Sequence, residues 1–236
     1  MKHIIGTRAR TICIAGLAVL GLVACNQQDM RTFTAKELQL INSTDSIMRV
    51  LTIEDSLDLA VLRASSVDLP ASALLSEDFS KLSALLVATV THPSQDGVGI
   101  AGPQVGLNRR VIAVQRFDKE IGTGDGEDAT GDGTGSINPF EVYANIRIVE
   151  KSEAMSPGSE GCLSVPDRSE EVMRSKEIVI EYADMEALKK VAAERAVSGK
   201  GIRKVPMVRE TITGFTAVIF QHEVDHLEGV LYIDRI

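Results

Sequence analysis

The most regular pattern of apolar positions in this chain lies near its C-terminal end, over residues 211–227. Spacings of three and four residues place the following side chains on one face of a helix: Phe215, Val218, Ile219, His222 and His226. Gly229 follows at a position suited to a helix C-cap. The pattern predicts a helix that presents two imidazoles on its apolar face.

A second amphipathic stretch lies between Ser76 and about Thr91. Leu82, Leu85 and Leu86 recur there at helical spacing. The serine that opens the stretch is followed by an acidic residue, which suits the start of a helix. We therefore predict a helix over 76–91.

Two short runs have the composition of β-strands. Val-Ile-Ala-Val at 111–114 is mostly β-branched and is bounded by polar residues, and 177–182 alternates between polar and apolar positions. The polar stretch around 198–204 predicts a hairpin or loop. Short strands combined with a late helix indicate an α+β fold.

Three other segments lack a clear period. Residues 26–41 are polar and predict a tether, and residues 47–69 mix apolar and acidic positions. Residues 121–136 are rich in glycine and aspartate, which predicts a flexible surface insertion. A calcium-binding loop is the alternative for this insertion, but it lacks the bidentate glutamate of such loops and its flanks are not helical.

The N-terminal residues resemble a targeting segment. Lys2, Arg8 and Arg10 precede an apolar run over residues 12–22. This run is short for a membrane span, because a spanning helix needs about 20 residues. The Leu-Val-Ala-Cys sequence that follows resembles a bacterial lipobox, in which cleavage before Cys25 makes that residue the acylated N-terminus.

A chain of 236 residues is long enough for one domain with a hydrophobic core. We expect a lipoprotein signal peptide over 1–24, a tether over 25–46 and a single domain over 47–236. Cys25 would then anchor the protein to a membrane, on the periplasmic or outer-membrane side. An ordinary secretory signal and an uncleaved anchor are the alternatives, and a protein whose signal is not used would stay in the cytoplasm.

Charge and cysteine content narrow the function further. Acidic residues outnumber basic ones by 33 to 25, which argues against nucleic acid as a partner, and loss of the three signal cations would change the net charge from -8 to -11. Cys13 would leave with the signal and Cys25 would be lipidated, so Cys162 would be the thiol of the folded domain. An exported protein has to bury such a thiol, react with it or use it to bind a metal.

The segment His222-Glu223-Val224-Asp225-His226 carries the strongest chemical signal. Its two imidazoles are four residues apart, so on a helix they lie one turn apart on the same face and can share one metal ion. Glu223 lies beside them, within reach of a water molecule at that ion. Because this short pattern also occurs by chance, it needs support from the rest of the chain.

A catalytic metal site of this type needs three protein ligands and an open position. Ten residues follow His226, with Glu228 and Asp234 as their carboxylates, so a third ligand from upstream is favoured. Cys162, within Glu-Gly-Cys-Leu-Ser-Val-Pro at 160–166, offers a thiolate, which together with two imidazoles suits Fe(II) or Zn(II). A buried structural thiol is the alternative for Cys162 considered alone.

A third segment, Gly-Val-Gly-Ile-Ala-Gly-Pro-Gln at 97–104, follows the first predicted helix. Closely spaced glycines let the backbone approach a ligand, and the amide of Gln104 can donate a hydrogen bond to a developing oxyanion. A phosphate-binding loop is the competing interpretation, but the Lys-Ser/Thr ending of such loops is absent.

Together these three segments resemble the peptide deformylase family, whose motifs are GxGxAAxQ, EGCLS and HExDH in that order. The resemblance covers about residues 47–236. It implies an α+β fold in which short antiparallel sheets pack around the C-terminal HExDH helix. It also implies hydrolysis of the N-formyl group of formyl-methionyl peptides, with release of formate. The implied cofactor is one divalent ion, Fe(II) or Zn(II), held by Cys162, His222 and His226.

The resemblance also assigns roles to other residues. Glu223 matches the residue that moves a proton from the attacking water to the leaving amine. Gln104 and the backbone N–H of Leu163 match the groups that hold the formyl oxygen, and Gly99 matches a backbone contact to the substrate. The methionine side-chain pocket of the family corresponds to apolar residues here: Val98, Phe215, Val218 and Ile219.

Arg174 matches the arginine that pairs with the aspartate of HExDH, which is Asp225 in this chain. Two positions depart from the family pattern. Gly102 stands where the family usually has alanine. Ser169 stands where many members have an arginine that contacts the substrate backbone, and Arg168 is its neighbour.

The lipobox raises a question about the substrate. Deformylases normally act in the cytoplasm on nascent chains, whereas the lipobox would place this protein across the membrane. Its substrates would then be formylated peptides, released signal fragments or another amide, and zinc is an alternative to the oxidisable Fe(II). The other functions to weigh are an exported metallopeptidase or amidohydrolase and an inactive peptide- or metal-binding lipoprotein. We expect a monomer.

Overall fold

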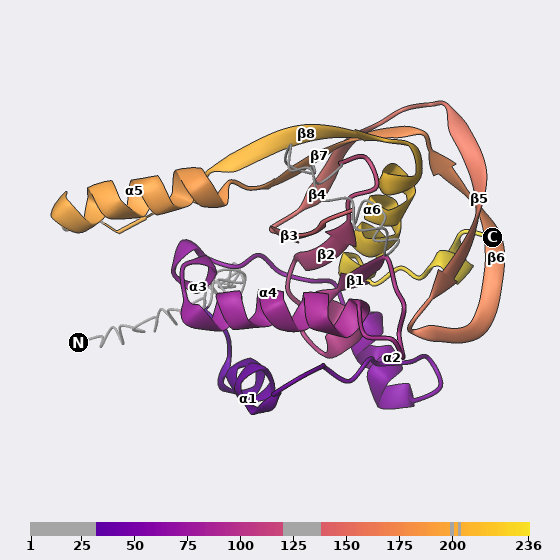
Figure 1. Ribbon diagram of the computed structural model, residues 1–236, viewed down its shortest axis with the longest axis horizontal. Coiled ribbons are helices and arrows are strands. Elements are labelled where there is room, and N and C mark those ends of the chain that lie inside the picture. The colour runs from indigo at the N-terminus through magenta and orange to yellow at the C-terminus, as the bar shows by residue number, and fades with distance from the viewer. Residues whose placement is uncertain (1–31, 120–137, 199–200, 203) are drawn as a thin grey trace, which may run out of the picture.

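The computed structural model describes residues 32–119, 138–198, 201–202 and 204–236, in which three short antiparallel sheets surround a C-terminal helix (Figure 1). The helices are α1 (Ala35–Ser43), α2 (Ser56–Leu62), α3 (Ala71–Leu74), α4 (Glu77–Val90), α5 (Met185–Ser198) and α6 (Gly214–Leu227), with 3₁₀ turns η2 (Gly102–Val105) and η3 (Tyr232–Asp234). The strands are β1 (Gly99–Ala101), β2 (Val111–Gln115), β3 (Phe140–Ala144), β4 (Arg147–Lys151), β5 (Met155–Cys162), β6 (Val165–Ser175), β7 (Glu177–Ala183) and β8 (Met207–Thr213). The predicted signal peptide, Cys25 and the predicted insertion at 121–136 lie outside the described residues.

The first sheet has the order β1-β2-β3 and is covered on both faces. Side chains of a strand point alternately to opposite faces. Val111 and Ala113 therefore pack into the cluster that contains α4, while Ile112 and Val114 pack into the cluster that contains α6. This double burial explains why 111–114 is a continuous apolar run. The strand predicted there is confirmed.

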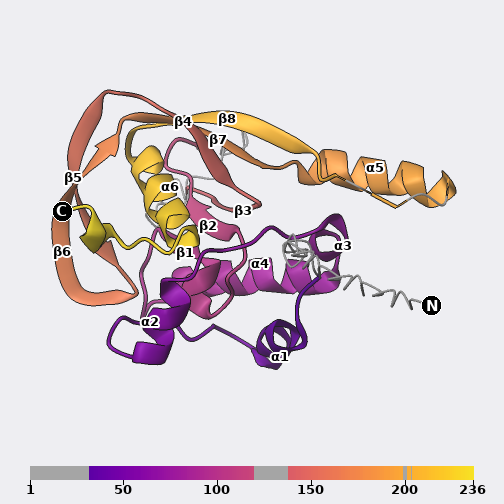
Figure 2. The same cartoon turned by 180° about the vertical axis from the view of Figure 1, so that it is seen from behind.

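Helix α6 lies between the first sheet and a second one of order β4-β7-β8, as the views from both sides show (Figures 1 and 2). Its apolar side chains meet Ile112 and Val114 of β2 and also Ile178 and Ile180 of β7. Burial between two sheets makes this helix a rigid support for side chains near its C-terminal end.

The predicted C-terminal helix over 211–227 is too long by one turn. Residues 211–213 continue β8, where Thr211 is paired with Val179 and Thr213 with Glu177. Gly214 then takes a φ of +64° and starts α6. The β-branched residues at 211–213 suit the strand, and the pairing with β7 decided between the two structures.

The third sheet is the long hairpin of β5 and β6, which lies at one end of the molecule (Figure 1). Its register runs from the Met155–Ser175 pair to the Gly161–Ser169 pair and then shifts to the Cys162–Val165 pair. Cys162 is thereby held at the tip of the hairpin, close to α6.

The tether predicted over 25–46 is wrong for its described part. Residues 35–43 form α1, which begins with a capping box in which Thr34 accepts a hydrogen bond from Glu37 N–H and the Glu37 carboxylate accepts one from Thr34 N–H. Phe33 and Ile41 are buried in the cluster that also contains α4. The folded body therefore includes described residues ahead of the boundary predicted at residue 47.

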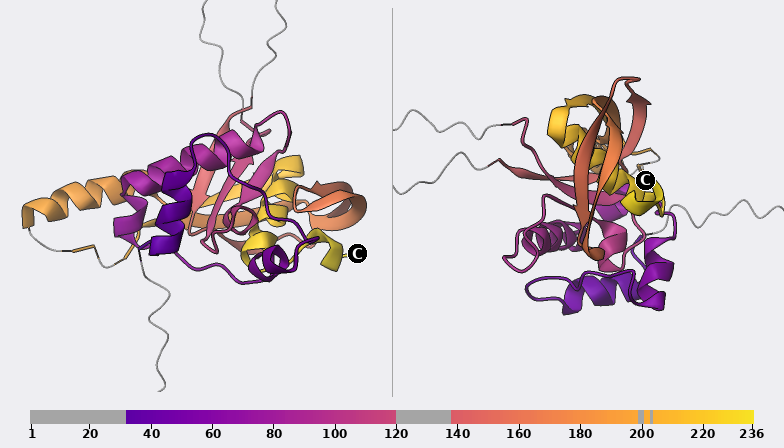
Figure 3. Two further views of the ribbon diagram at one scale, coloured as in Figure 1. Left: turned by 90° about the horizontal axis from the view of Figure 1, so that it is seen from below. Right: turned by 90° about the vertical axis from the view of Figure 1, so that its right-hand side faces the viewer.

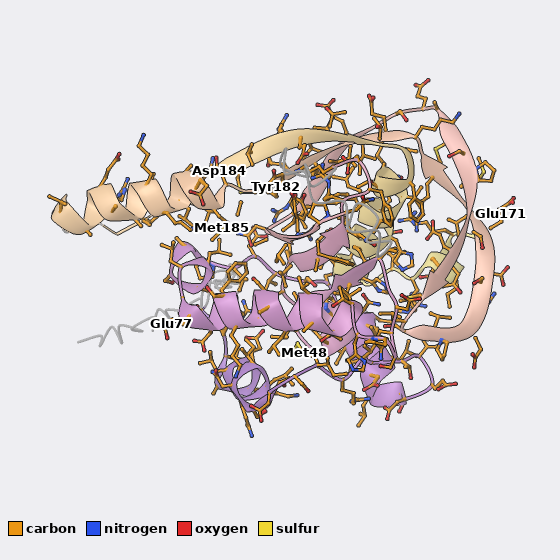
Figure 4. The ribbon with its side chains drawn as sticks, viewed as in Figure 1. Met48, Glu77, Glu171, Tyr182, Asp184 and Met185 are labelled. Carbon is orange, nitrogen blue, oxygen red and sulfur yellow. The ribbon has the colours of Figure 1, made fainter. Side chains whose placement is uncertain are left out.

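Helix α5, which the sequence does not predict, connects β7 to β8 and extends away from the body of the molecule (Figures 1 and 3). Asp184 and Met185 mark its start at the end of β7 (Figure 4), and the Asp184 side chain accepts a hydrogen bond from the Ala187 N–H at 2.9 Å. Because most of its residues are not buried, it has little of the apolar periodicity that reveals a helix in sequence. The other predicted elements, the helix over 76–91 and the strand over 177–182, are confirmed as α4 and β7.

Candidate active site

A cleft of about 690 Å³ lies where β1, η2, the β5–β6 hairpin and α6 meet. The motifs at 97–104, 160–166 and 222–226 all reach it, although they are far apart in the chain. Predicted site residues that line it are Val98, Gly99, Gln104, Cys162, Leu163, Phe215, Val218, Ile219, His222 and Glu223.

Three donor side chains converge at this cleft, which Cys162 and His222 line and beside which His226 is buried. Cys162 comes from the tip of the hairpin, and His222 and His226 come from adjacent turns of α6. One ligand atom from each lies within 4.8 Å of the other two, and Cys162 Sγ is 3.2 Å from His226 Nε2. Tetrahedral coordination with sulfur and nitrogen ligands separates those atoms by about 3.5 Å. The cluster therefore fits one metal ion.

Glu160 orients one of the histidines. Its carboxylate lies 2.8 Å from Nδ1 of His222, which leaves Nε2 of that ring for a metal ion. It also accepts hydrogen bonds from Arg174 at 2.7 and 2.9 Å. Burial of Glu160 opposes its ionisation, but the hydrogen bonds from Arg174 and His222 outweigh this and lower its pKa to about 2.

Without a metal ion, the pKa values of the two imidazoles shift in opposite directions. Burial lowers the pKa of His222, but Cys162, Glu160 and the negative charge of Glu223 outweigh it and raise that pKa to about 10. Burial, reinforced by the nearby charge of His222, lowers the pKa of His226 well below its ordinary value. A metal ion competes with protons for such nitrogens.

Glu223 lies against the backbone of β1. Its carboxylate packs so closely over Gly99 that a Cβ atom at that position would come within 2.9 Å of Glu223 Cγ and Cδ. The side chain is buried, and among the described residues its Oε2 has no hydrogen-bond partner. Burial raises the pKa of Glu223 to about 7, so that both protonation states are accessible near neutral pH.

The orientation of the Gln104 amide is set by its neighbours. Its Oε1 accepts a hydrogen bond from Ala101 N–H at 2.8 Å, so the opposite end of the amide carries the N–H donors. Nε2 donates to Ser164 Oγ at 3.3 Å and lies 3.6 Å from Cys162 Sγ. Gln104 is 1% exposed, so this donor is held rigidly beside the thiol.

The cleft has an apolar wall made by the residues predicted to line a methionine pocket. Phe215 and Val98 are 55% and 36% exposed, whereas Ile219 is 4% exposed. The Phe215 ring also packs against Phe117, with ring centroids 5.2 Å apart. The exposed fraction of the wall residues thus decreases from Phe215 and Val98 to the buried Ile219.

The predicted pair of Arg174 and Asp225 is present, with Arg174 Nη1 2.6 Å from Asp225 Oδ2. Both groups are buried. Arg235, near the C-terminus, adds two hydrogen bonds of 2.6 Å to the same carboxylate. A continuous chain of charged pairs therefore runs from His222 through Glu160, Arg174 and Asp225 to Arg235.

Sequence reasoning missed three contributors to the site: Glu160, Ser164 and Arg235. Glu160 could have been found, because a metal-bound histidine normally donates its second nitrogen to a carboxylate and Glu160 lies two residues before Cys162. Ser164 gave no local signal, since its partner Gln104 is 60 residues away. Arg235 gave none because its contact with Asp225 depends on how the chain turns back after α6.

The sequence and the fold both match known proteins. The family model described as polypeptide deformylase matches residues 47–236. A peptide deformylase from Leptospira biflexa is 32% identical over 176 residues, covering 75% of this chain and 82% of the relative. One from Caulobacter vibrioides is 31% identical over 191 residues, covering 81% and 88%.

Solved structures agree with these matches. The actinonin-bound class I type b peptide deformylase from Acinetobacter baumannii is 28% identical, with a TM-score of 0.59 over 81% of this chain and 99% of that one. The peptide deformylase from Thermotoga maritima is 29% identical, with a TM-score of 0.55 over 81% and 99%. The α+β fold expected around the HExDH helix is thereby confirmed. With its three motifs gathered around one cleft, this chain belongs to the peptide deformylase family.

Proposed function

We propose that this protein is a metal-dependent hydrolase that removes the N-formyl group from formyl-methionyl peptides and releases formate. The observation that carries this proposal is the convergence of Cys162, His222 and His226 at a cleft that Glu223 also lines. Three protein ligands leave a position open for water at a metal, and an adjacent carboxylate can act as the base for that water.

The donor set would hold one divalent ion through Cys162 Sγ and one nitrogen of each histidine. When bound, such an ion supplies Lewis-acid chemistry: it polarises a carbonyl oxygen and makes water more acidic. The protein's own contribution is to hold these ligands in place, and the Glu160–His222 contact does so for one of them.

The remaining steps fall to residues of the cleft. The apolar wall of Val98, Phe215, Val218 and Ile219 would accept the methionine side chain. The Gln104 amide would donate a hydrogen bond to the formyl oxygen as negative charge develops on it, together with the N–H of Leu163. These positions would orient the formyl carbon toward the attacking water.

Glu223 would transfer the proton. In its ionised form it accepts a proton from the water that attacks the formyl carbon, and it then donates that proton to the amine as the C–N bond breaks. A pKa of about 7 suits both halves of this cycle. The products are formate and a peptide with a free N-terminal amine.

The test is formate release from formyl-Met-Ala-Ser by purified protein loaded anaerobically with Fe(II). We expect turnover that falls by about 100-fold or more in Glu223→Gln, the range for loss of a general base. No formate above the level of that variant would refute the proposal. New internal cleavage products by mass spectrometry would point to a metallopeptidase in its place.

We further propose that the ion is Fe(II), with Zn(II) as the alternative. A thiolate and two imidazoles accept either metal. Metal analysis of protein purified without added metal, followed by activity after reloading with each ion, decides between them. Higher turnover with Zn(II) than with Fe(II) would overturn the iron assignment.

We propose, from the Leu-Val-Ala-Cys sequence, that the protein is an exported monomeric lipoprotein attached through Cys25. Within the described residues, no helix has the length and apolar character needed to cross a bilayer. Cys25→Ser should release the protein from the membrane fraction, and continued tight association would refute lipidation. Light scattering of the released protein measures its molar mass and tests whether it is a monomer.

A further inference from the structure

We propose that Arg168 binds the terminal carboxylate of short formylated peptides, so that free peptides are preferred over the same sequences with a blocked C-terminus. This inference rests on the proposed deformylase activity and names its substrate class. It starts from the rim of the cleft, which Asp167, Arg168 and Ser169 line on the hairpin side.

The backbone of this rim departs from regular β-structure. Between the Gly161–Ser169 pair and the Cys162–Val165 pair the register advances by one residue on β5 and by four on β6. Residues 166–168 therefore bulge out of β6, and Asp167 takes a φ of +57°. Bulges next to active sites redirect side chains, and a strained non-glycine residue is retained only where its surroundings enforce it.

The bulge is tied to the metal-binding helix. The hydroxyl of Tyr232 donates a hydrogen bond of 2.8 Å to the Arg168 carbonyl, and Tyr232 is 1% exposed. The same ring stacks near His222, with centroids 5.9 Å apart and planes 23° apart. The backbone of Arg168 thus has a fixed position relative to the metal-binding cluster.

The guanidinium of Arg168 is only partly used within the protein. Its Nε donates to Glu170 Oε1 at 2.8 Å, which restrains the side chain, and the side chain remains 45% exposed. Among the described residues, the side-chain hydrogen bond of Arg168 is made through Nε, so its two Nη groups are available to a ligand. A planar pair of N–H donors matches the two oxygens of a carboxylate.

The acidic residues near Arg168 do not prevent it from binding an anion. Asp96 and Asp167 also line the cleft, but both are exposed to solvent, where water and salt screen their repulsion of an anion. Glu170 contacts Nε and leaves the fork between the Nη atoms open. A neutral peptide carbonyl could accept one of these donors, but a carboxylate accepts two and binds more strongly.

We therefore expect the enzyme to prefer short peptides that end in a free carboxylate. A cleft of about 690 Å³ has the size of a small-ligand site, and its lining includes both the exposed Arg168 and the largely buried metal ligand His222. A peptide of two or three residues would place its formyl group at one end and its carboxylate near the other. Nascent chains and amidated peptides offer no such carboxylate.

The experiment compares kcat/KM for formyl-Met-Ala and formyl-Met-Ala-Ser, each as free acid and as C-terminal amide, with the metal-loaded full chain. We expect the acid to be preferred by about tenfold at one of the two lengths, the low end for a hydrogen-bonded charge pair because Arg168 is partly exposed. Arg168→Met should bring this ratio to about one, and Arg168→Lys should give an intermediate ratio because it keeps the charge and loses the fork.

Arg209→Met is the matched control. Arg209 is also an exposed arginine whose Nε donates to a glutamate, Glu181 at 2.9 Å, but it does not line the cleft. It should keep the acid preference of the unmodified protein. Equal kcat/KM for acid and amide at both lengths, or a preference that survives in Arg168→Met, would overturn the inference while leaving the deformylase activity intact. Absence of formate from all four peptides would instead refute the proposed function.

Discussion

Gly99→Ala places a methyl group where the Glu223 side chain lies. The new Cβ would come within 2.9 Å of Glu223 Cγ and Cδ, closer than carbon atoms approach without repulsion. The φ of Gly99 is not positive, so the backbone of β1 accepts alanine without strain. The clash with Glu223 is therefore the main effect of this substitution.

The magnitude follows from which atoms must move. They belong to the flexible end of a side chain, so the fold can adjust by displacing Glu223, and we expect a loss of about 1 kcal/mol in unfolding free energy, the low end for an overpacked site. A displaced general base is far more costly for the reaction. Because misplacement by about 1 Å costs about 100-fold in rate, we expect kcat to fall by about 100-fold.

The assay is formate release by the metal-loaded enzyme, with metal content and urea denaturation measured on the same preparation. Gly158→Ala is the control, because a Cβ at Gly158 on β5 would meet no atom within 4 Å. If Gly99→Ala keeps kcat within about threefold of the unmodified enzyme at full metal content, Glu223 does not act from its position above Gly99.

Three further predictions concern one residue beside the metal ligands and two buried residues elsewhere in the domain. Glu160→Gln should weaken metal binding by about 10- to 100-fold, because it removes the carboxylate that accepts from His222; competition with a chelator measures this. Arg116→Met should cost about 3 kcal/mol in urea unfolding, because Arg116 is 1% exposed and pairs with three carboxylates. Its hydrogen bond also lowers the pKa of Asp118, so stability present above the ordinary value of 3.8 is lost as pH falls through the lower folded value, and the variant should lose that dependence. Ile41→Ala should cost about 3 kcal/mol, since Ile41 is 0% exposed.

Each of these predictions has a control and a result that would contradict it. Glu171 points outward from β6 (Figure 4), and unchanged metal affinity in Glu160→Gln, as expected for Glu171→Gln, would remove Glu160 from the site. A pH dependence in Arg116→Met equal to that of the unmodified chain would assign it to other groups. Leu57 is 78% exposed, so Leu57→Ala is the control and should change the free energy of unfolding little. If Ile41→Ala has the same stability as Leu57→Ala, α1 does not contribute to the core.

Local patterns identified most elements near the site. The period of α4 follows from a helix with one buried face, and the alternation of β7 follows from a strand between solvent and α6. The capping box at Thr34–Glu37 is also a local signal, but most residues of 26–41 are polar, and this composition favours a tether. Helix α5 offered no comparable signal, since most of its residues are not buried.

The sequence by itself determined the chemical identity of the site. His222, Glu223 and His226 share one helix face, because their spacing is set by the helix alone. Cys162 and Gln104 could be named because they lie in short motifs in a fixed order, but their spacing along the chain says nothing about distance.

Only the tertiary structure decided how these groups act on one another. The approach of Glu223 to Gly99, the pairing of Arg174 with Asp225 and the hydrogen bond of Tyr232 to the Arg168 carbonyl all join segments remote in sequence. Such contacts arise when sheets and helices bury their apolar faces together, and their geometry depends on the packing of the whole domain. Proton affinity at the site depends on the same burial, which is why the pKa of Glu223 could not be inferred from its motif.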